Sequence, residues 1–458
     1  MKFLHFADLS ILLFYLIVLI WIGFKNKTST TTDFILSGRK LSYVSFIATL
    51  VTTWYGAILG IGENTYLYGI QTWFIFSLPY YVFAFIYAIY IAPSINSKGY
   101  MSIPDHFYKT YGKKSGLISG ILIIFLTSPA PYILSLGTLI QLFFNINFGL
   151  ALIISTIFSI IYIWNSGFKA IIRTDIFQFI CMFISFLILI AFLWKSLGNP
   201  SQMILSLPEK YLDPLGGNSL QYFIVWFFIA AWTFIDPGFY QRSAAAKNPK
   251  VARNGILLAI IFWAIFDTLT ILCGLYAINY LKINNALNTY PMIAIEFLPI
   301  GFFGFFITGI FAIIMSTIDS LSFISALTLG RDIFWRIKFK NKNNIVFFIR
   351  IGLIISSFIS LSLAYFLPSV VKLLFTLGSI IIPSLILPFI FSLTLANNEI
   401  SDTDAIKWIV FPLIISLMWL FLSKSGYDFF QNIEPFYPGM FSSILFFLII
   451  KGQKWQLK

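Results

Sequence analysis

The sequence has very little charge for its length. Only 10% of its 458 residues are charged, whereas 59% are hydrophobic. A soluble domain usually carries about 25% charged residues, which cover its surface. Because this coverage is missing, the composition excludes an ordinary soluble protein and indicates a helical membrane protein with many spans. The apolar runs are continuous, so they also exclude an outer-membrane barrel, whose strands alternate apolar and polar residues.

Histidine and cysteine are scarce as well. The two histidines, His5 and His106, lie outside the apolar runs, whereas a membrane-embedded enzyme would group histidines and acids within them. The two cysteines, Cys181 and Cys273, lie inside apolar runs, which excludes a disulfide framework and a cysteine metal site. The sequence also has no nucleotide-binding P-loop, which argues against transport driven by ATP. We therefore expect neither an enzyme nor an organic cofactor.

The basic residues outnumber the acidic ones by 30 to 17, but they form no single patch that would bind nucleic acid. They lie in short clusters between apolar runs, as cytoplasmic loops of membrane proteins do. If the loop after the first run is cytoplasmic, 24 of the 30 lysines and arginines lie on that side and six on the other. A miscounted span would blur this ratio. The pattern therefore predicts an external N-terminus and a cytoplasmic C-terminus.

The apolar runs predict thirteen membrane spans. The first, Ile11 to Phe24, has the length of a signal peptide, but it lacks a small-residue cleavage site and lysines follow directly. We interpret it as a retained helix. The other twelve predicted spans lie at about 42–60, 72–94, 115–145, 149–166, 172–196, 220–242, 253–281, 292–328, 345–368, 370–395, 406–424 and 437–451.

Glycines interrupt the second predicted span. Gly56 follows the segment Leu50–Tyr55, and Gly60 and Gly62 come before Glu63 at the outer end. Each glycine weakens a helix by about 1 kcal/mol relative to alanine. A break here would free backbone carbonyls, which must then face protein or a cavity. The alternative is an unbroken helix whose small residues allow close packing.

The seventh predicted span carries a second interruption, Trp232–Gly238, in which Asp236 precedes Pro237. Proline removes a backbone donor and clashes with the preceding turn. We favour a functional break, although Asp236 would also serve as the cap of a second half-helix.

The ninth predicted span contains a cluster of hydroxyls. Ser316 and Ser320 share one helix face, and Ile313 lies one turn earlier. Hydroxyls and a main-chain carbonyl are ligands that suit a small, hard cation. The alternative is that the hydroxyls bond their own helix, but the nearby carboxyl group of Asp319 favours an ion site.

The two breaks are five spans apart, and this spacing is typical of an inverted-repeat transporter with its binding site at the membrane midplane. It predicts a single all-α transporter domain with a leading helix in residues 1–41. The first repeat would be 42–196, the second 220–395, and two C-terminal helices would follow in 396–458.

Four segments in chain order resemble motifs of the sodium:solute symporter family, whose members carry sugars, proline, pantothenate, sialic acid, iodide, choline and other solutes. The similarity covers nearly the whole chain. The segments are Asp33–Arg39 (DFILSGR); Gly167–Ala170 (GFKA) with Thr174, Asp175 and Gln178; Asp236–Pro237 with Gln241–Lys247 (QRSAAAK); and Met315–Thr317 (MST) with Arg331–Ile333 (RDI).

The resemblance implies a LeuT-like fold of two inverted five-helix repeats, with one helix before them and two after. It also implies sodium-coupled symport of a small organic solute by alternating access across a bacterial cytoplasmic membrane. The family's sodium ligands carry over to Leu50, Thr53, Ile313, Ser316 and Thr317. Some members bind a second sodium ion, and the residues that match its position here are Asp175, Ser316, Asp319 and Ser320. Because Asp319 replaces a hydroxyl, this set is a candidate for a second ion or for the ion pathway.

The solute is expected between the two breaks, near Thr52, Trp54, Tyr55, Gly56, Ala57, Trp232, Thr233 and Asp236. Where sugar-carrying members place polar contacts, this chain has Thr52, Phe76 and Ile229, which argues against a sugar. Two tryptophans, a tyrosine and a carboxylate would suit an organic cation. Alternatively, these aromatic residues pack the bundle or gate the site. For Asp267, deep in the eighth span, a structural hydrogen bond and proton coupling are the two alternatives.

The expected partners are therefore a small organic solute, sodium and the lipid bilayer, and a monomer is compatible with this function. The nearest alternative is a proton-coupled symporter of the same fold. A channel is disfavoured because the sequence has no filter-like repeat. A transporter-like sensor is disfavoured because the sequence has no soluble signalling domain.

Overall fold

The computed structural model describes residues 4–25, 30–161, 163–338, 344–367, 369–394, 399–425 and 428–456. These residues are helical and form no strand, which confirms the predicted all-α class. The helices up to the first long loop are α1 (Phe6–Phe24), α2 (Thr31–Leu36), α3 (Tyr43–Trp54), α4 (Ile58–Tyr68), α5 (Gln71–Phe76), α6 (Leu78–Ile86), α7 (Ala92–Lys98), α8 (Ile103–Thr110), α9 (Lys113–Leu126), α10 (Ala130–Phe144), α11 (Phe148–Ile160), α12 (Ile163–Ser166) and α13 (Phe168–Leu197).

The rest of the described chain is also helical. Its helices are α14 (Pro200–Leu205), α15 (Leu220–Ile229), α16 (Pro237–Ala245), α17 (Pro249–Tyr280), α18 (Thr289–Phe297), α19 (Phe302–Leu327), α20 (Arg336–Lys338), α21 (Ile345–Phe366), α22 (Val370–Thr394), α23 (Asp402–Leu422), α24 (Asp428–Gln431) and α25 (Phe436–Gln456). Between α19 and α20, the segment η6 (Thr328–Trp335) is a π-helix.

The described helices include eleven segments that are long and apolar enough to cross a membrane, and the bent pair of α3 and α4 makes twelve. The last predicted span corresponds to a shorter apolar helix, Phe436–Ile450. The prediction of many membrane spans is therefore confirmed, whereas the number thirteen stays a prediction.

One predicted span begins in the wrong place. The sequence analysis predicts a continuous span over 292–328, but the structure divides this segment into α18 and α19. Between them, Pro299 has no backbone N–H to continue a helix, and Gly301 adopts a φ of 86°. The membrane helix therefore begins at Phe302.

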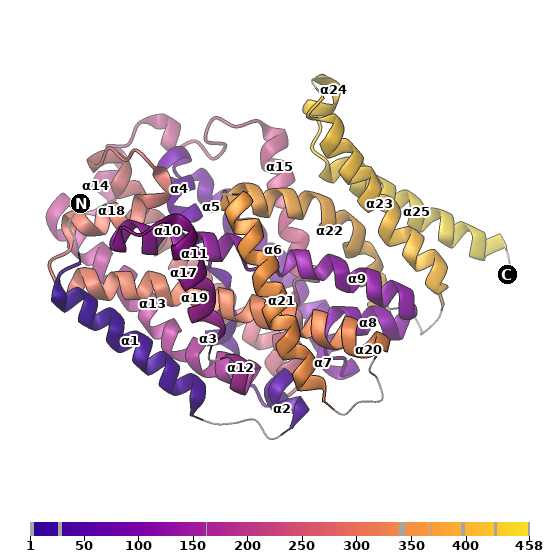
Figure 1. The fold of residues 1–458 in the computed structure, drawn as a ribbon. Coiled ribbons are helices and arrows are strands. Elements are labelled where there is room, and N and C mark those ends of the chain that lie inside the picture. Colours follow the sequence, from indigo (N-terminus) through magenta and orange to yellow (C-terminus); the bar gives the residue numbers. More distant parts are fainter. Residues whose placement is uncertain are drawn as a thin grey trace.

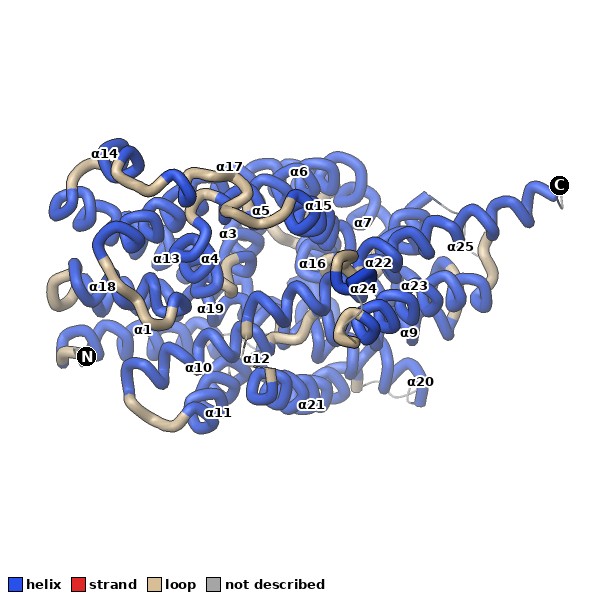
Figure 2. The backbone as a smooth tube through the Cα atoms, turned by 90° about the horizontal axis from the view of Figure 1, so that it is seen from above, coloured by secondary structure: helices blue, strands red, loops and turns tan. Residues whose placement is uncertain are grey.

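Helix α19 is the centre of the molecule. Its apolar window is completely buried, and α1, α3 and α13 pack along it (Figures 1 and 2). Asp8 of α1 fixes its N-terminal end, because Asp8 Oδ1 accepts hydrogen bonds from the backbone N–H groups of Gly301 at 2.7 Å and Gly304 at 2.9 Å. Gly309 lies so close to Ser185 of α13 that no side chain fits between them. Residues on α19 are thus held against three neighbouring helices.

The first predicted break is present in the second span. α3 ends at Trp54, α4 begins at Ile58, and the two helices are bent by 55°. The three residues between them carry the bend. The residues in the break, Tyr55, Gly56 and Ala57, are therefore among those that the sequence analysis predicts to bind the solute.

The second predicted break is present as well. α15 passes into a 3-10 segment, η4 (Ala230–Ile235), and α16 starts at Pro237 after the extended residue Asp236. Asp236 Oδ1 accepts a hydrogen bond of 2.8 Å from the backbone N–H of Phe239. The carboxyl group of Asp236 therefore caps the second half-helix, as the alternative interpretation predicted. The helix is nevertheless broken at this residue.

Helices α23 and α25 lie at one edge of the molecule (Figures 1 and 2). They pack against each other and also contact α22. The C-terminal pair is therefore attached to the rest of the described chain mainly through α22 and α9.

Candidate functional site

The first break lies directly against α19. The hydroxyl of Thr317 donates to the backbone oxygen of Thr53 at 2.9 Å and to that of Ile313 at 3.3 Å. The two elements approach closely because Gly56 has no side chain; a Cβ atom there would lie 2.5 Å from Cβ of Thr317. The hydroxyl of Thr317 thus lies within hydrogen-bond distance of two other predicted sodium ligands, Thr53 and Ile313. Leu50, a fourth, lines the same cavity as Thr53 and Thr317.

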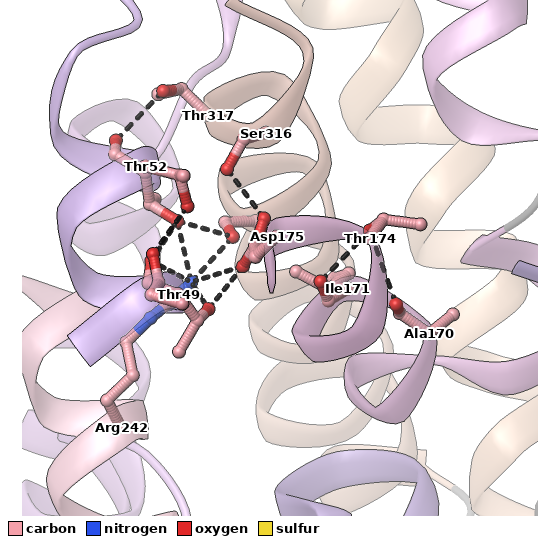
Figure 3. Close-up of polar contacts among 12 residues, drawn as sticks. Thr49, Thr52, Ala170, Ile171, Thr174, Asp175, Arg242, Ser316 and Thr317 are labelled. Atoms are coloured by element: carbon pink, nitrogen blue, oxygen red, sulfur yellow. Dashed lines mark hydrogen bonds and ion pairs between the residues drawn. The ribbon is translucent and has the colours of Figure 1, made fainter. Parts of the chain in front are cut away.

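The fifth predicted ligand, Ser316, faces Asp175 of α13. Its hydroxyl donates to Asp175 Oδ1 at 2.6 Å, and the hydroxyl of Thr49 donates to Asp175 Oδ2. All three residues are completely buried. Asp175 therefore joins α3, α13 and α19, and Figure 3 shows its contact with Ser316.

The structure corrects the interpretation of Arg242. The sequence analysis counts it among the cytoplasmic loop charges, but its side chain is completely buried. Nη2 of Arg242 lies 3.7 Å from Asp175 Oδ2 and donates to hydroxyls of Thr53 at 2.8 Å and Ser320 at 2.7 Å. In the sequence, the QRSAAAK motif was the only sign that Arg242 belongs to a functional segment. The tertiary structure adds that α16 places the Arg242 side chain in the protein interior.

The four residues predicted for a second ion do not form one cluster. Ser320 contacts Arg242 and also the hydroxyl of Thr53, at 3.1 Å. Asp319 is fully buried, yet neither of its carboxyl oxygens has a hydrogen-bond partner among the described residues. The structure therefore brings Asp175, Ser316 and Ser320 together and leaves Asp319 apart.

A cavity of about 130 Å³ lies between the two breaks. Five of the predicted solute-binding residues line it: Trp54, Tyr55, Ala57, Trp232 and Asp236.

The other three predicted solute-binding residues do not line the cavity. The hydroxyl of Thr52 donates to the backbone oxygen of Ala48 in its own helix. Gly56 lies against Thr317, and Thr233 is buried. Thr52, Gly56 and Thr233 therefore face protein rather than the cavity.

The sequence analysis missed most of the aromatic wall. Trp54 is central to it, with ring centroids 4.8 Å from Tyr80 and 5.8 Å from Phe239. Tyr80 lies in α6, which carries no sequence motif, and Phe239 lies in α16 between two motif segments, so only the fold shows that both rings face Trp54. The further residues that line the cavity are Gly60, Ile61, Phe76, Leu126, Tyr132, Trp226, Ile229, Gly238, Arg242, Asp267 and Leu321.

Asp267 adds a second carboxyl group to the cavity lining, beside that of Asp236. It accepts a short hydrogen bond from the hydroxyl of Tyr81. The predicted structural hydrogen bond is therefore present. Its position in the lining also lets Asp267 act on a bound solute.

Two broken helices, a buried central helix whose oxygen atoms meet the first break, and a cavity between the breaks are the features of a LeuT-like fold. A solved structure of a substrate-bound, outward-open Na+-coupled sialic acid symporter has the same fold, with a TM-score of 0.77. The match covers 96% of this chain and 97% of that one, at 17% identity.

The model of the sodium:solute symporter family matches residues 34–397. The chain belongs to this family, which confirms the resemblance and the prediction of a transporter rather than an enzyme.

Two curated relatives illustrate the range of the family. The high-affinity choline transporter 1 of Drosophila melanogaster is 23% identical over 403 residues, which are 79% of this chain and 62% of that protein. Sodium/proline symporter 2 of Staphylococcus saprophyticus is 24% identical over 359 residues, which are 72% of this chain and 69% of that protein. The chain thus spans less than two thirds of the length of the choline transporter.

Proposed function

We propose that this protein is a secondary transporter that couples the entry of sodium to the uptake of a small organic solute by alternating access. The observation that carries the proposal is the contact of Thr317 with the backbone oxygens of Thr53 and Ile313. It joins the first broken helix to α19. The proposed sodium ligands are Leu50, Thr53, Ile313, Ser316 and Thr317.

The chemistry of these ligands supports sodium. They are carbonyl and hydroxyl oxygens with little fixed charge, and a divalent ion would need more carboxylates. The membrane potential then draws each sodium ion inward with about 2.3 kcal/mol per 100 mV.

The chain order at the first break supports coupling between ion and solute. Thr53 contacts α19, and the next residue, Trp54, lines the cavity. An ion that fixes Thr53 also restricts Trp54, so sodium strengthens solute binding and the solute strengthens sodium binding by the same factor.

We propose that the solute is a small organic cation. Asp236 and Asp267 line the cavity, its walls are aromatic, and Arg242 is the only base in its lining within the described chain. Buried charges require partners, and aromatic faces attract cations. The similarity to choline transporters supports the same class of solute.

The remaining predictions belong to the same proposal. They are the repeats at 42–196 and 220–395, the external N-terminus and the bacterial cytoplasmic membrane. A second ion at Asp175, Asp319 and Ser320 and a proton-coupled cycle through Asp267 or Asp319 are the alternatives for ion coupling.

Thermal unfolding of the purified protein in NaCl and in KCl of equal strength tests the proposal, because a ligand that binds the folded state raises its stability. We expect sodium to raise the unfolding temperature, and choline-like cations to raise it further only when sodium is present. Thr317→Val should abolish the sodium effect.

The matched control is Thr308→Val. Thr308 lies on the same helix, is equally buried and bonds only its own helix, through the backbone oxygen of Gly304 at 2.8 Å. Its sodium response should equal that of the wild type. Identical curves in NaCl and KCl for the wild type would refute sodium coupling, and a response to a neutral solute instead of cations would refute the proposed solute class.

A further inference from the structure

Five oxygen atoms surround a single nitrogen of Arg242. Nη2 lies 2.9 Å from Thr49 Oγ1, 2.8 Å from Thr53 Oγ1 and 2.7 Å from Ser320 Oγ. The backbone oxygen of Thr49 lies at 3.5 Å and Asp175 Oδ2 at 3.7 Å. These residues come from α3, α13 and α19, and Figure 3 shows the side chain of Arg242 reaching into the cluster.

The contacts of this guanidinium group are unevenly distributed. An arginine has five N–H groups in a planar fork and usually shares its partners among them. Nη2 carries two hydrogens for five oxygens, whereas Nε and Nη1 are buried and have no partner among the described residues. A shell of hydroxyl, carbonyl and carboxylate oxygens around one point is the geometry that suits a single hard cation.

We propose that Arg242 is a tethered cation whose Nη2 occupies a second ion position, so that the transporter binds one sodium ion at a time and its own arginine replaces a second. The shell consists of Thr49, Thr53, Ser320 and Asp175. This inference rests on the sodium coupling proposed above.

The balance of buried charge agrees with this assignment. The cavity lining and the oxygen shell of Arg242 together contain three carboxyl groups, those of Asp175, Asp236 and Asp267, and Arg242 neutralises one of them. One sodium ion and one cationic solute neutralise the other two, and buried charges are stable when paired. A second sodium ion in the presence of Arg242 would bring two cations into the same oxygen shell.

Thr53 links the two positions. Its backbone oxygen is a proposed ligand of the sodium ion, and its side-chain hydroxyl binds Arg242. Arg242 also lies close to the second break. A Cβ atom on Gly238 would lie near both Nη1 of Arg242 and Oδ1 of Asp236. Arg242 therefore binds the first broken segment and lies near the second.

Equilibrium binding of radioactive sodium to the purified protein without solute tests the proposal by the number of ions bound per chain. We expect one ion in the wild type. Arg242→Gln removes the guanidinium charge and leaves Asp175 without its partner, so this variant should bind two. Arg242→Lys keeps a point charge that fits the shell and should bind one, as in the wild type.

Arg39→Gln is the matched control, because Arg39 bonds only the backbone oxygens of Gly99 and Ala244. It should bind one ion. Two ions in the wild type, or one in Arg242→Gln, would overturn the proposal. No sodium binding in the wild type would instead refute the sodium coupling on which it rests.

A second measurement does not depend on the folding of an Arg242 variant. If Arg242 holds Ser320 in the wild type, Ser320→Ala should change the sodium affinity by less than about twofold, whereas Ser316→Ala should lower it by about tenfold or more. An equally large loss in both variants would show that Ser320 ligates the ion and that Arg242 does not fill the position.

Discussion

At the scale of single residues, Trp54 has the most demanding role. It follows Thr53, which contacts α19, and its ring meets Tyr80, Phe239 and Trp263 at centroid distances of 4.8 to 5.8 Å. A flat aromatic face in this place supplies both apolar contact and attraction for a cation. In the proposed mechanism, Trp54 therefore links sodium binding to solute binding.

We predict that Trp54→Ala weakens solute binding by about tenfold or more, since it removes a large apolar surface and a cation–π partner. Sodium binding without solute should change much less. Isothermal binding measurements in NaCl would show both quantities. Trp21→Ala is the control, because Trp21 is 60% exposed on the outer surface of α1. Equal solute affinity in wild type and Trp54→Ala would contradict the proposed binding cavity.

His106 provides a prediction about pH. It lies in α8, between membrane spans, where burial lowers the pKa of its imidazole to about 4. Ring nitrogen Nε2 lies 3.3 Å from the backbone oxygen of Ser392, and Nδ1 lies 3.4 Å from the hydroxyl of Tyr240, an arrangement that suits a neutral ring. An unfolded histidine has a pKa of about 6.5.

The unfolded chain therefore takes up a proton as the pH falls from about 6.5 to 4, while the folded chain does not. We predict that folded-state stability falls over this interval and that His106→Gln loses less of it than the wild type. Unfolding temperatures across a pH series would measure the difference. His5→Gln, which changes the exposed histidine, should keep the wild-type profile; an unchanged profile in His106→Gln would show that its burial does not limit acid stability.

At the scale of elements, the N-terminal end of α19 depends on a neighbouring helix. Its first residues follow Gly301 and have no cap from their own segment, and Asp8 of α1 supplies the acceptor instead. The carboxylate also stands at the positive end of the helix dipole. α1 is thus part of the structure that positions the MST segment.

We predict that Asp8→Ala lowers the stability of the protein by about 1–2 kcal/mol, because two backbone donors lose their acceptor. Asp8→Asn keeps an acceptor and should lose much less. Thermal unfolding of both variants in the same detergent would compare them. Equal losses in the two variants would show that the negative charge, and not the hydrogen bonds, holds α19.

At the scale of the whole molecule, α8 connects helices that are far apart in the sequence. Asp105 forms ion pairs with Arg331 at 3.4 Å and Arg336 at 2.5 Å, and Ser102 donates to Asp332 at 2.6 Å. Burial would raise the pKa of Asp105, but the two guanidinium groups outweigh it and lower the pKa. The same short helix contacts α22 through His106, so it connects α22 with η6.

The predicted orientation in the membrane is also a property of the whole molecule. Ser201 follows α13 on the side predicted to be external, and Lys247 follows α16 on the side predicted to be cytoplasmic; both are exposed. The native cysteines, Cys181 and Cys273, are buried and give little background.

We predict that a membrane-impermeant maleimide labels Ser201→Cys in intact cells and labels Lys247→Cys only after the membrane is opened. Labelling of opened membranes is the control for both variants. The opposite pattern would reverse the predicted orientation, and labelling of both in intact cells would contradict the span count between them.

The sequence predicted the features that depend on local chemistry. Gly56 and the Asp236–Pro237 pair mark the two breaks, because these residue types weaken or interrupt a helix, whereas Gly60 and Gly62 lie within the continuous helix α4. The same holds for the oxygen atoms of Thr53, Ser316 and Thr317, which a motif identifies. The sequence analysis missed the start of α19 because hydrophobicity alone does not distinguish a membrane span from a short apolar helix and the loop that follows it.

The composition and the order of apolar runs by themselves determined that this chain is a helical membrane protein, because a chain with so little charge cannot cover a water-exposed surface. Only the tertiary structure decided which side chains line the cavity and which one pairs with Asp175. In the sequence Arg242 is counted as a loop charge, Tyr80 and Phe239 are ordinary residues of their helices, and Asp267 is a buried acid without an assigned partner. They become an ion partner and a cavity wall only because α16, α6 and α17 converge on the first break. Convergence is a matter of packing between distant segments, which no local pattern encodes.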